Sequence, residues 1–237
     1  GAPAELVPHS KQVTSFLDTE SLTSNFLDEF DDSAGAGKPF FGVLFLACTH
    51  LPYQPPYPYN AQFADPHYDG PNRYAIDFKV DEFIKYGFAD SVLEKVRRHI
   101  VDLYDGGVAH FDAQVGCIMA HLRETGLEKN TILIITSDHG DDLYESGVTL
   151  GHGTNFFGGD QANRIPFVMR LPGGQHGPRR VPQIVRNIDM LPTVLELAGI
   201  ESRPPAIDGV SVTPLMHDPA PDLGLVAFAE SCYMFYP

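Results

Sequence analysis

The chain has 237 residues, of which 43% are hydrophobic and 20% charged, and its formal net charge is −15 at pH 7. This length suits one large α/β domain or two small ones, and the hydrophobic content is that of a folded globular protein. A surface this acidic repels the phosphate backbone, which argues against nucleic acid as a partner. An anionic substrate would need local positive charge, such as a metal ion.

Residues 1–38 form a polar lead-in for which the sequence predicts one amphipathic helix. Its apolar positions are Phe16, Leu17, Phe26, Leu27 and Phe30. The small residues at 33–37 (SAGAG) are typical of a flexible connection. We therefore divide the chain into this lead-in and an α/β domain over residues 39–237.

The first strand is predicted at residues 40–47 (FFGVLFLA), directly after Pro39. A continuous apolar run of this length indicates a strand buried on both faces, as in a parallel sheet. It leads into residues 49–59, where prolines and aromatic residues exclude regular structure. No run in the chain approaches the roughly 20 apolar residues that cross a bilayer, so no membrane-spanning segment is predicted.

A long helical pattern occupies residues 91–126. Apolar residues recur at helical spacing on both sides of Gly106 and Gly107, where we expect a kink or a break. The first set is Val92, Val96, Ile100 and Leu103, and the second is Val108, Phe111, Val115, Ile118, Met119 and Leu122. Gly126 suits the end of the helix, and the β-branched run at 131–136 (TILIIT) predicts a strand.

Further elements are predicted in the last third of the chain. A strand is expected at 165–170, a helix at 183–199, and weaker strands at 208–212 and 225–230. A helix followed by a short turn and a strand indicates a crossover onto a parallel sheet. The fold class expected is therefore α/β, with a mostly parallel sheet flanked by helices on both faces.

Residues 137–140 (SDHG) directly follow the predicted strand 131–136. Ligands of open α/β sheets bind at the carboxyl ends of strands, and a carboxylate beside an imidazole suits a divalent cation. We expect Gly140 to permit the turn that lets Asp138 and His139 reach one ion. The alternative is that Asp138 caps a helix and His139 lies in a loop, and spacing alone does not decide.

Two further histidines are candidates for contact with an anionic ligand. His152 lies between two glycines and titrates near neutral pH, although an ordinary surface loop is the alternative. His50 follows the predicted strand 40–47, with a packing role in the aromatic loop as the alternative. Asp112 falls on the apolar face of the long helix, where we expect a structural role. The acids at 141–145 are expected to begin a solvated helix.

These motifs occur in a characteristic order. They are 39–41 (PFF), 49–56 (THLPYQPP), 111–116 (FDAQVG), 125–140 (TGLEKNTILIITSDHG), 151–153 (GHG), 164–167 (RIPF), 187–193 (NIDMLPT), 198–200 (AGI) and 208–209 (DG). Over roughly residues 35–235 this series resembles the sulfatase family. That family belongs to the alkaline-phosphatase-like superfamily of metal-dependent hydrolases and transferases.

The resemblance implies roles for particular residues. Asp138 and His139 match the family's second pair of metal ligands, and His50 matches the histidine that holds the substrate anion. His152 falls where the family places a lysine or histidine at the anion or the leaving group. The implied cofactor is one divalent ion, Mn²⁺, Ca²⁺, Mg²⁺ or Zn²⁺, with an imidazole ligand favouring Mn²⁺ or Zn²⁺ weakly.

Two family elements do not occur in these 237 residues: the strand that ends in two acidic metal ligands, and the nucleophile motif C/S-x-P-x-R. Cys48, Cys117 and Cys232 are each followed by other residues. We therefore expect the C-terminal portion of a catalytic domain, inactive and weak or deficient in metal binding when alone. The missing N-terminal half is then an expected partner.

The function that the resemblance implies is hydrolysis of sulfate esters by a metal-dependent enzyme. The Asp-His pair also resembles phosphodiester or phosphonate hydrolases and envelope phosphoglycerol or phosphoethanolamine transferases, so a phosphate ester substrate stays open. A third alternative is a non-catalytic fragment or degenerate relative. Family members are usually exported, which implies an extracytoplasmic location that is periplasmic, secreted or anchored.

Overall fold

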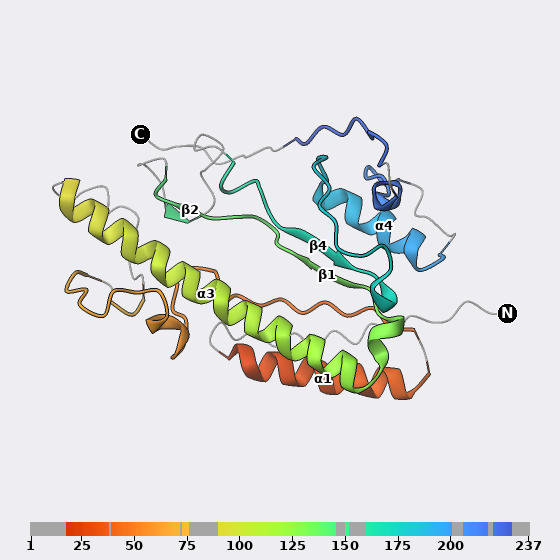
Figure 1. The fold of residues 1–237 in the computed structure, drawn as a ribbon, viewed down its shortest axis with the longest axis horizontal. Coiled ribbons are helices and arrows are strands. Elements are labelled where there is room, and N and C mark those ends of the chain that lie inside the picture. Colours follow the sequence, from red (N-terminus) through yellow and green to blue (C-terminus); the bar gives the residue numbers. More distant parts are fainter. Residues whose placement is uncertain are drawn as a thin grey trace. The chain divides into compact units, whose positions relative to one another are not determined.

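The computed structural model describes residues 18–37, 39–71, 73–75, 90–145, 150–151, 160–200, 206–217 and 220–228. The chain folds as two compact units that divide between Glu124 and Thr125. Figure 1 traces the elements of each unit. His152 and the end of the weak strand predicted at 225–230 lie outside the described residues.

The first unit contains two helices that lie side by side, α1 (Thr19–Gly35) and α3 (Asp90–Glu124), as Figure 1 shows. A short 3-10 helix, η1 (Tyr59–Ala61), packs against α3. The expected lead-in helix is therefore present over Thr19–Gly35, while Phe16 and Leu17 lie outside the described residues. Asp18 caps its start, and its side chain accepts a hydrogen bond from the backbone of Ser21 at 3.1 Å.

Paired imidazoles and carboxylates join α1 to α3. His110 Nε2 lies 2.8 Å from Glu20 Oε1, and His121 Nε2 lies 2.8 Å from Asp31 Oδ1. Because both pairs join residues 90 positions apart, the two helices run in the same direction. Apolar burial is concentrated nearer the start of α3, where Val96, Ile100 and Leu103 are buried as predicted.

The break predicted at Gly106 and Gly107 is wrong, because α3 is a continuous helix of 35 residues. Here the glycines permit close packing. A Cβ at Gly106 would lie 2.7 Å from the carbonyl oxygen of Tyr59, and one at Gly107 would lie 2.4 Å from that of Cys48. The loop backbone thus rests directly on the helix, at a cost in helix propensity of about 1 kcal/mol per glycine.

The second apolar set of α3 is only partly buried. Leu122 is buried, whereas Val108 is exposed. Asp112 is also exposed, so of the two alternatives for a carboxylate on this face, burial with a hydrogen bond or a place beside a site, burial is not found. The helix ends beside Gly126, whose φ of 73° is the left-handed conformation expected after a helix.

The strand predicted at residues 40–47 is not formed in the described structure. Phe41, Val43 and Phe45 are 75%, 73% and 66% exposed. A strand requires a hydrogen-bonded neighbour, and no strand of the described residues pairs with this segment. One side of it nevertheless rests on α1, where the Phe30 and Phe40 rings meet edge to face with centroids 4.4 Å apart.

The second unit contains two antiparallel strand pairs. β1 (Leu133–Thr136) pairs with β4 (Phe167–Arg170), and β2 (Asp142–Leu143) pairs with β3 (Leu150–Gly151). The α/β fold class is confirmed by solved structures described below. The strands of the described residues pair only in the antiparallel sense. The strand that we predicted at 40–47 for a parallel sheet belongs to the other unit and forms no strand pairing.

The rest of the second unit is made of short helices and irregular segments. The predicted helix at 183–199 starts later, with η5 (Asn187–Asp189) leading into α4 (Met190–Leu197). The other 3-10 helices are η2 (Leu127–Asn130), η4 (Pro172–Gly174) and η6 (Thr213–Met216). The predicted strand at 208–212 is absent, because its backbone donors bond to side chains instead. No helix among the described residues is long and apolar enough to cross a membrane.

Candidate metal centre

The loop of residues 137–140 follows β1 directly, at the carboxyl end of the strand. In this loop Asp138 Oδ2 lies 3.7 Å from His139 Nε2. Two donors that each sit about 2.1 Å from one ion are separated by no more than about 4.2 Å, so this spacing fits chelation of a single cation. Both side chains are accessible to solvent and therefore to further ligands.

The ring of His139 is oriented by the backbone carbonyl of the residue that follows it. His139 Nδ1 lies 2.9 Å from the carbonyl oxygen of Gly140. A carbonyl only accepts, so in the neutral ring the proton is on Nδ1 and the lone pair is on Nε2, toward Asp138. Metal-binding histidines are commonly oriented by a hydrogen bond of this kind from the second ring nitrogen.

The two carboxylate oxygens of Asp138 have different surroundings. Oδ1 accepts the backbone N–H of His139 at 3.0 Å and lies 3.4 Å from Ser137 Oγ. Oδ2 is the oxygen nearer the imidazole of His139. One oxygen thus holds the loop while the other faces the candidate metal position.

Gly140 permits close packing of the loop and does not use the left-handed conformation that glycine favours. Its backbone N–H donates to Ala162 O at 2.8 Å, and a Cβ there would lie 2.1 Å from Gln161 O. Gly140 is not among the residues with positive φ. The loop is therefore fixed against residues 160–164, and Ser137 Oγ adds a bond to His139 O at 2.6 Å.

The solvated helix expected at 141–145 is wrong. Asp142 begins β2 and is completely buried. Its Oδ1 accepts the N–H of Glu145 at 2.9 Å, while Glu145 Oε2 accepts the N–H of Leu143 at 2.8 Å. These acids satisfy backbone donors in a tight turn, which is a structural role.

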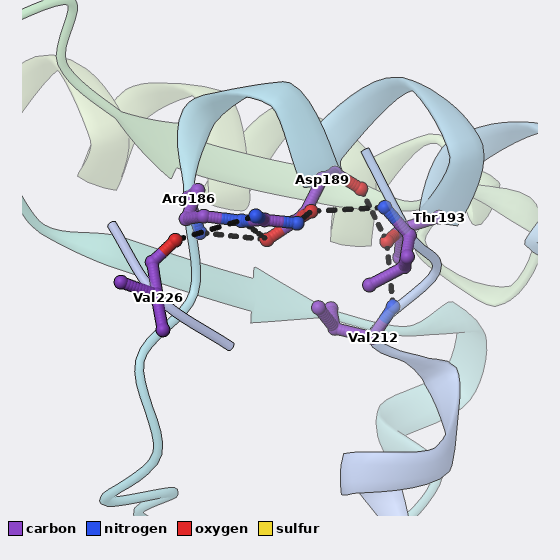
Figure 2. A network of polar contacts seen from close by, with 6 residues as sticks. Arg186, Asp189, Thr193, Val212 and Val226 are labelled. Atoms are coloured by element: carbon purple, nitrogen blue, oxygen red, sulfur yellow. Dashed lines mark hydrogen bonds and ion pairs between the residues drawn. The ribbon is translucent and has the colours of Figure 1, made fainter. Parts of the chain in front are cut away.

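Near this loop lies a buried polar cluster that the sequence analysis did not find (Figure 2). Its centre is Asp189, which is completely buried. Arg186 donates from Nε at 3.0 Å and from Nη2 at 2.8 Å to the two carboxylate oxygens, and the N–H of Val210 donates at 2.9 Å. Burial alone raises the pKa of Asp189, but these hydrogen bonds outweigh it and hold the pKa below its ordinary value.

Thr193 extends this cluster to a further segment of the chain. Its hydroxyl donates to Asp189 O at 2.6 Å and accepts the N–H of Val212 at 3.0 Å (Figure 2). Gly209 lies so close that a Cβ would be 1.9 Å from Ile188 O. The motifs at 187–193 and 208–209, which carried the resemblance, are thus two halves of one contact, which we call the Arg186–Asp189 clasp.

His50 lies in the first unit, in the loop after residues 40–47. Its Nδ1 is 2.6 Å from Leu51 O, so this ring is oriented by the next carbonyl, as His139 is. The loop is anchored by Tyr53, which is buried and meets Tyr104 edge to face at 5.5 Å between centroids. His152 is outside the described residues, and its proposed role rests on the sequence alone.

Within the described parts of the chain, no group of three or more His, Cys, Asp or Glu side chains converges as a metal site. Asp138 and His139 alone would supply only part of a coordination shell of four or more ligands. The chemistry of this pair, one carboxylate oxygen and one imidazole, fits a divalent cation.

Similarity to solved structures defines the class of protein. Phosphonate monoester hydrolase from Silicibacter pomeroyi superposes with a TM-score of 0.62 at 29% identity, over 84% of this chain and 41% of that chain. A putative sulfatase from Bacteroides fragilis superposes with a TM-score of 0.64 at 21% identity, which shows the fold alone. The fold is therefore that of the alkaline-phosphatase-like proteins.

The family follows from sequence comparison. The family model described as Sulfatase matches residues 3–200, so the chain belongs to the sulfatase family, and the resemblance seen in the motifs is confirmed. Rat steryl-sulfatase is 27% identical over 229 residues, covering 92% of this chain and 33% of the relative. Choline-sulfatase from Rhizobium meliloti is 32% identical over 199 residues, covering 83% and 35%. The chain spans about a third of the length of these curated relatives.

Proposed function

We propose that this chain is the C-terminal portion of the catalytic domain of a metal-dependent enzyme that hydrolyses sulfate esters. The observation that carries the proposal is the Asp138 carboxylate 3.7 Å from His139 Nε2, at the end of β1, in a member of the sulfatase family. Solvated anions are bound poorly by a chain with a net charge of −15, so a cation at this loop supplies the positive charge that a sulfate ester needs.

The partial nature of the domain is supported by the exposed segment at 40–47. Phe41, Val43 and Phe45 alternate along it, which is the pattern of one face of a strand. Three large apolar side chains in one exposed row are typical of a surface that another part of the protein covers. We propose that this row packs in a sheet with the remainder of the catalytic domain, which also contributes the nucleophile and the other metal ligands. Residues 1–38 remain, in this proposal, the lead-in to the domain.

Within the reaction, Asp138 and His139 hold the cation through Oδ2 and Nε2. A bound divalent ion would neutralise anionic ester oxygens and lower the pKa of the nucleophile. We assign to His152 the donation of a proton to the leaving oxygen. The identity of the ion stays open among Mn²⁺, Ca²⁺, Mg²⁺ and Zn²⁺, with the imidazole favouring Mn²⁺ or Zn²⁺.

His50 is assigned to a non-bridging oxygen of the ester. Because its Nδ1–H is directed at Leu51 O, Nε2 donates a hydrogen bond only when the ring carries a second proton. Donation to the anion through His50 Nε2 therefore belongs to the imidazolium form. The charge of that form also strengthens the contact with an anionic oxygen.

A second candidate substrate class is favoured by one comparison. The phosphonate monoester hydrolase of Silicibacter pomeroyi is 29% identical to this chain, so a phosphodiester or phosphonate ester is the alternative substrate. The envelope phosphoglycerol and phosphoethanolamine transferases remain part of this alternative, and a non-catalytic relative is the third. For each catalytic reading we propose an extracytoplasmic location.

The proposal is tested in the full-length protein that contains this chain, with nitrophenyl sulfate and a phenylphosphonate monoester as substrates. We expect metal-dependent hydrolysis of the sulfate ester, and a loss of at least about 100-fold in kcat/KM for Asp138→Ala, since a metal ligand is removed. The matched control is Asp112→Ala, which removes an exposed carboxylate of α3 and should keep full activity.

Two results would contradict this assignment. Hydrolysis of the phosphonate ester without hydrolysis of the sulfate ester would assign the protein to the second substrate class, the phosphodiesters and phosphonate esters. Activity of Asp138→Ala that equals wild type, with sensitivity to chelators retained, would remove Asp138 from the metal centre.

A further inference from the structure

The Arg186–Asp189 clasp is closed by several hydrogen bonds, and Asn187 within it contacts the candidate metal loop. Asp189 is completely buried and accepts hydrogen bonds from Arg186 and Val210. Arg186 Nη1 also approaches Val226 O at 3.4 Å (Figure 2). A carboxylate held from several directions in this way loses most of its freedom, and so does the backbone on either side of it.

Asn187 is part of the backbone that the clasp immobilises. It occupies η5, between Arg186 and Asp189. The N–H of Asp189 donates to Arg186 O at 2.9 Å, and the N–H of Arg186 donates to Asp189 Oδ2 at 2.9 Å, which closes the turn around Asn187. The direction in which its side chain leaves the backbone is therefore set by buried contacts.

The side chain of Asn187 reaches the metal loop. Its Nδ2 donates to the carbonyl oxygen of Asp138 at 3.2 Å, across 49 residues of sequence. The carbonyl of Asp138 belongs to the peptide plane that joins the two candidate ligands. Holding this plane fixes the positions of the two Cα atoms from which the Asp138 and His139 side chains leave, and so narrows the range of directions in which the carboxylate and the imidazole can point.

We infer that Asn187 is a positioning residue for the metal centre, transmitting the rigidity of the Arg186–Asp189 clasp to the Asp138–His139 pair. This inference rests on the proposed function, because it assumes that the pair holds a cation. The amide touches no metal or substrate in this assignment. It keeps Oδ2 and Nε2 aimed at one point, so that binding does not have to order the loop.

The test uses the full-length protein, stripped of metal and titrated with Mn²⁺ while free Mn²⁺ is followed by electron paramagnetic resonance. Asn187→Ala removes the amide, and Asn187→Asp keeps the size while replacing the donor with an acceptor. Both should weaken Mn²⁺ binding by about 10-fold, the lower end of the range for residues that orient metal ligands. Ile188→Ala is the matched control, because its exposed side chain belongs to the same turn.

The thermal midpoint of the metal-free protein separates positioning from folding. Asn187 is exposed, so both variants should melt within about 2 °C of wild type. Unchanged Mn²⁺ affinity in both variants overturns the inference, and so does a parallel loss of affinity and stability, which is the mark of a structural role. Retention of Mn²⁺ binding by Asp138→Ala is a separate result, which rejects the proposed function itself.

Discussion

The two compact units differ in what they bury. The large side chains with the least exposure in the first unit include Tyr53, Ile100 and Leu103, whereas those of the second unit include Asp142, Asp189 and Thr193. Apolar burial is non-directional and tolerates small shifts, but a buried carboxylate is stable only with its partners in place. Polar side chains are buried in both units, but the most deeply buried large ones are mainly apolar or aromatic in the first unit and mainly polar in the second, where their hydrogen bonds also serve the candidate site.

The largest effect is expected from removing the centre of the polar cluster. Asp189→Ala leaves the Arg186 guanidinium and the N–H of Val210 without their acceptor. Loss of one partner of a fully buried ion pair costs about 3–5 kcal/mol, and because the Arg186 side chain is 19% exposed we expect the lower end, about 3 kcal/mol. The free energy of unfolding, measured with urea in the full-length protein, should fall by this amount. A loss under about 1 kcal/mol would mean that the clasp contributes little and that the contrast between the units is wrong.

A glycine in the first unit gives the next largest effect. Gly107→Ala places a methyl group 2.4 Å from Cys48 O, so the loop must move off α3. Overpacking of this kind costs about 1–3 kcal/mol. Gly116→Ala is the control in the same helix, where the methyl group meets nothing within 4 Å and should instead stabilise by up to about 1 kcal/mol. Equal effects at the two glycines would contradict the close-packing role.

The smallest expected effect is a difference between the two units in how the cost of a mutation, measured as free energy of unfolding, changes with pH. The pKa of Asp189 is lowered on folding, so its contribution is fully present above its ordinary value of 3.8 and is lost as the pH falls below it. The destabilisation by Asp189→Ala should therefore shrink between pH 6 and pH 3. That of Leu103→Ala, a cavity in the first unit, should be the same at both pH values. A parallel decline in the two variants would show that acid weakens the whole protein uniformly.

Local patterns made part of the fold and of the candidate site predictable. The spacing of Val96, Ile100 and Leu103 predicted the buried stripe of α3, because helical periodicity is a property of the sequence itself. The β-branched residues before Asp138 predicted β1, and the end of that strand is where the loop of residues 137–140 lies. The order of short motifs predicted the family, which the comparison with known proteins confirmed.

Other features depended on partners far away in the chain. The apolar run at 40–47 has the composition of a strand, yet without a pairing strand it stays exposed. Gly106 and Gly107 have the composition of a helix break, yet the helix is continuous there, and the missing side chains let loop carbonyls approach it closely. Gly140 likewise allows a close approach of Gln161, which its place after the strand did not predict. Each of these outcomes depends on tertiary contacts with residues far away in the sequence, which a local pattern cannot predict.

The sequence by itself determined the family, the helix α3, the strand β1 and the position of Asp138 and His139 after it, because periodicity, propensity and motif order are encoded locally. Only the tertiary structure decided that Asp142 and Asp189 are buried, and that Asn187 contacts the backbone of Asp138. The physical reason is that a carboxylate or an amide can be either exposed to water or buried in the interior with hydrogen-bond partners. The choice depends on donors supplied by residues such as Val210, which is 21 positions away from Asp189.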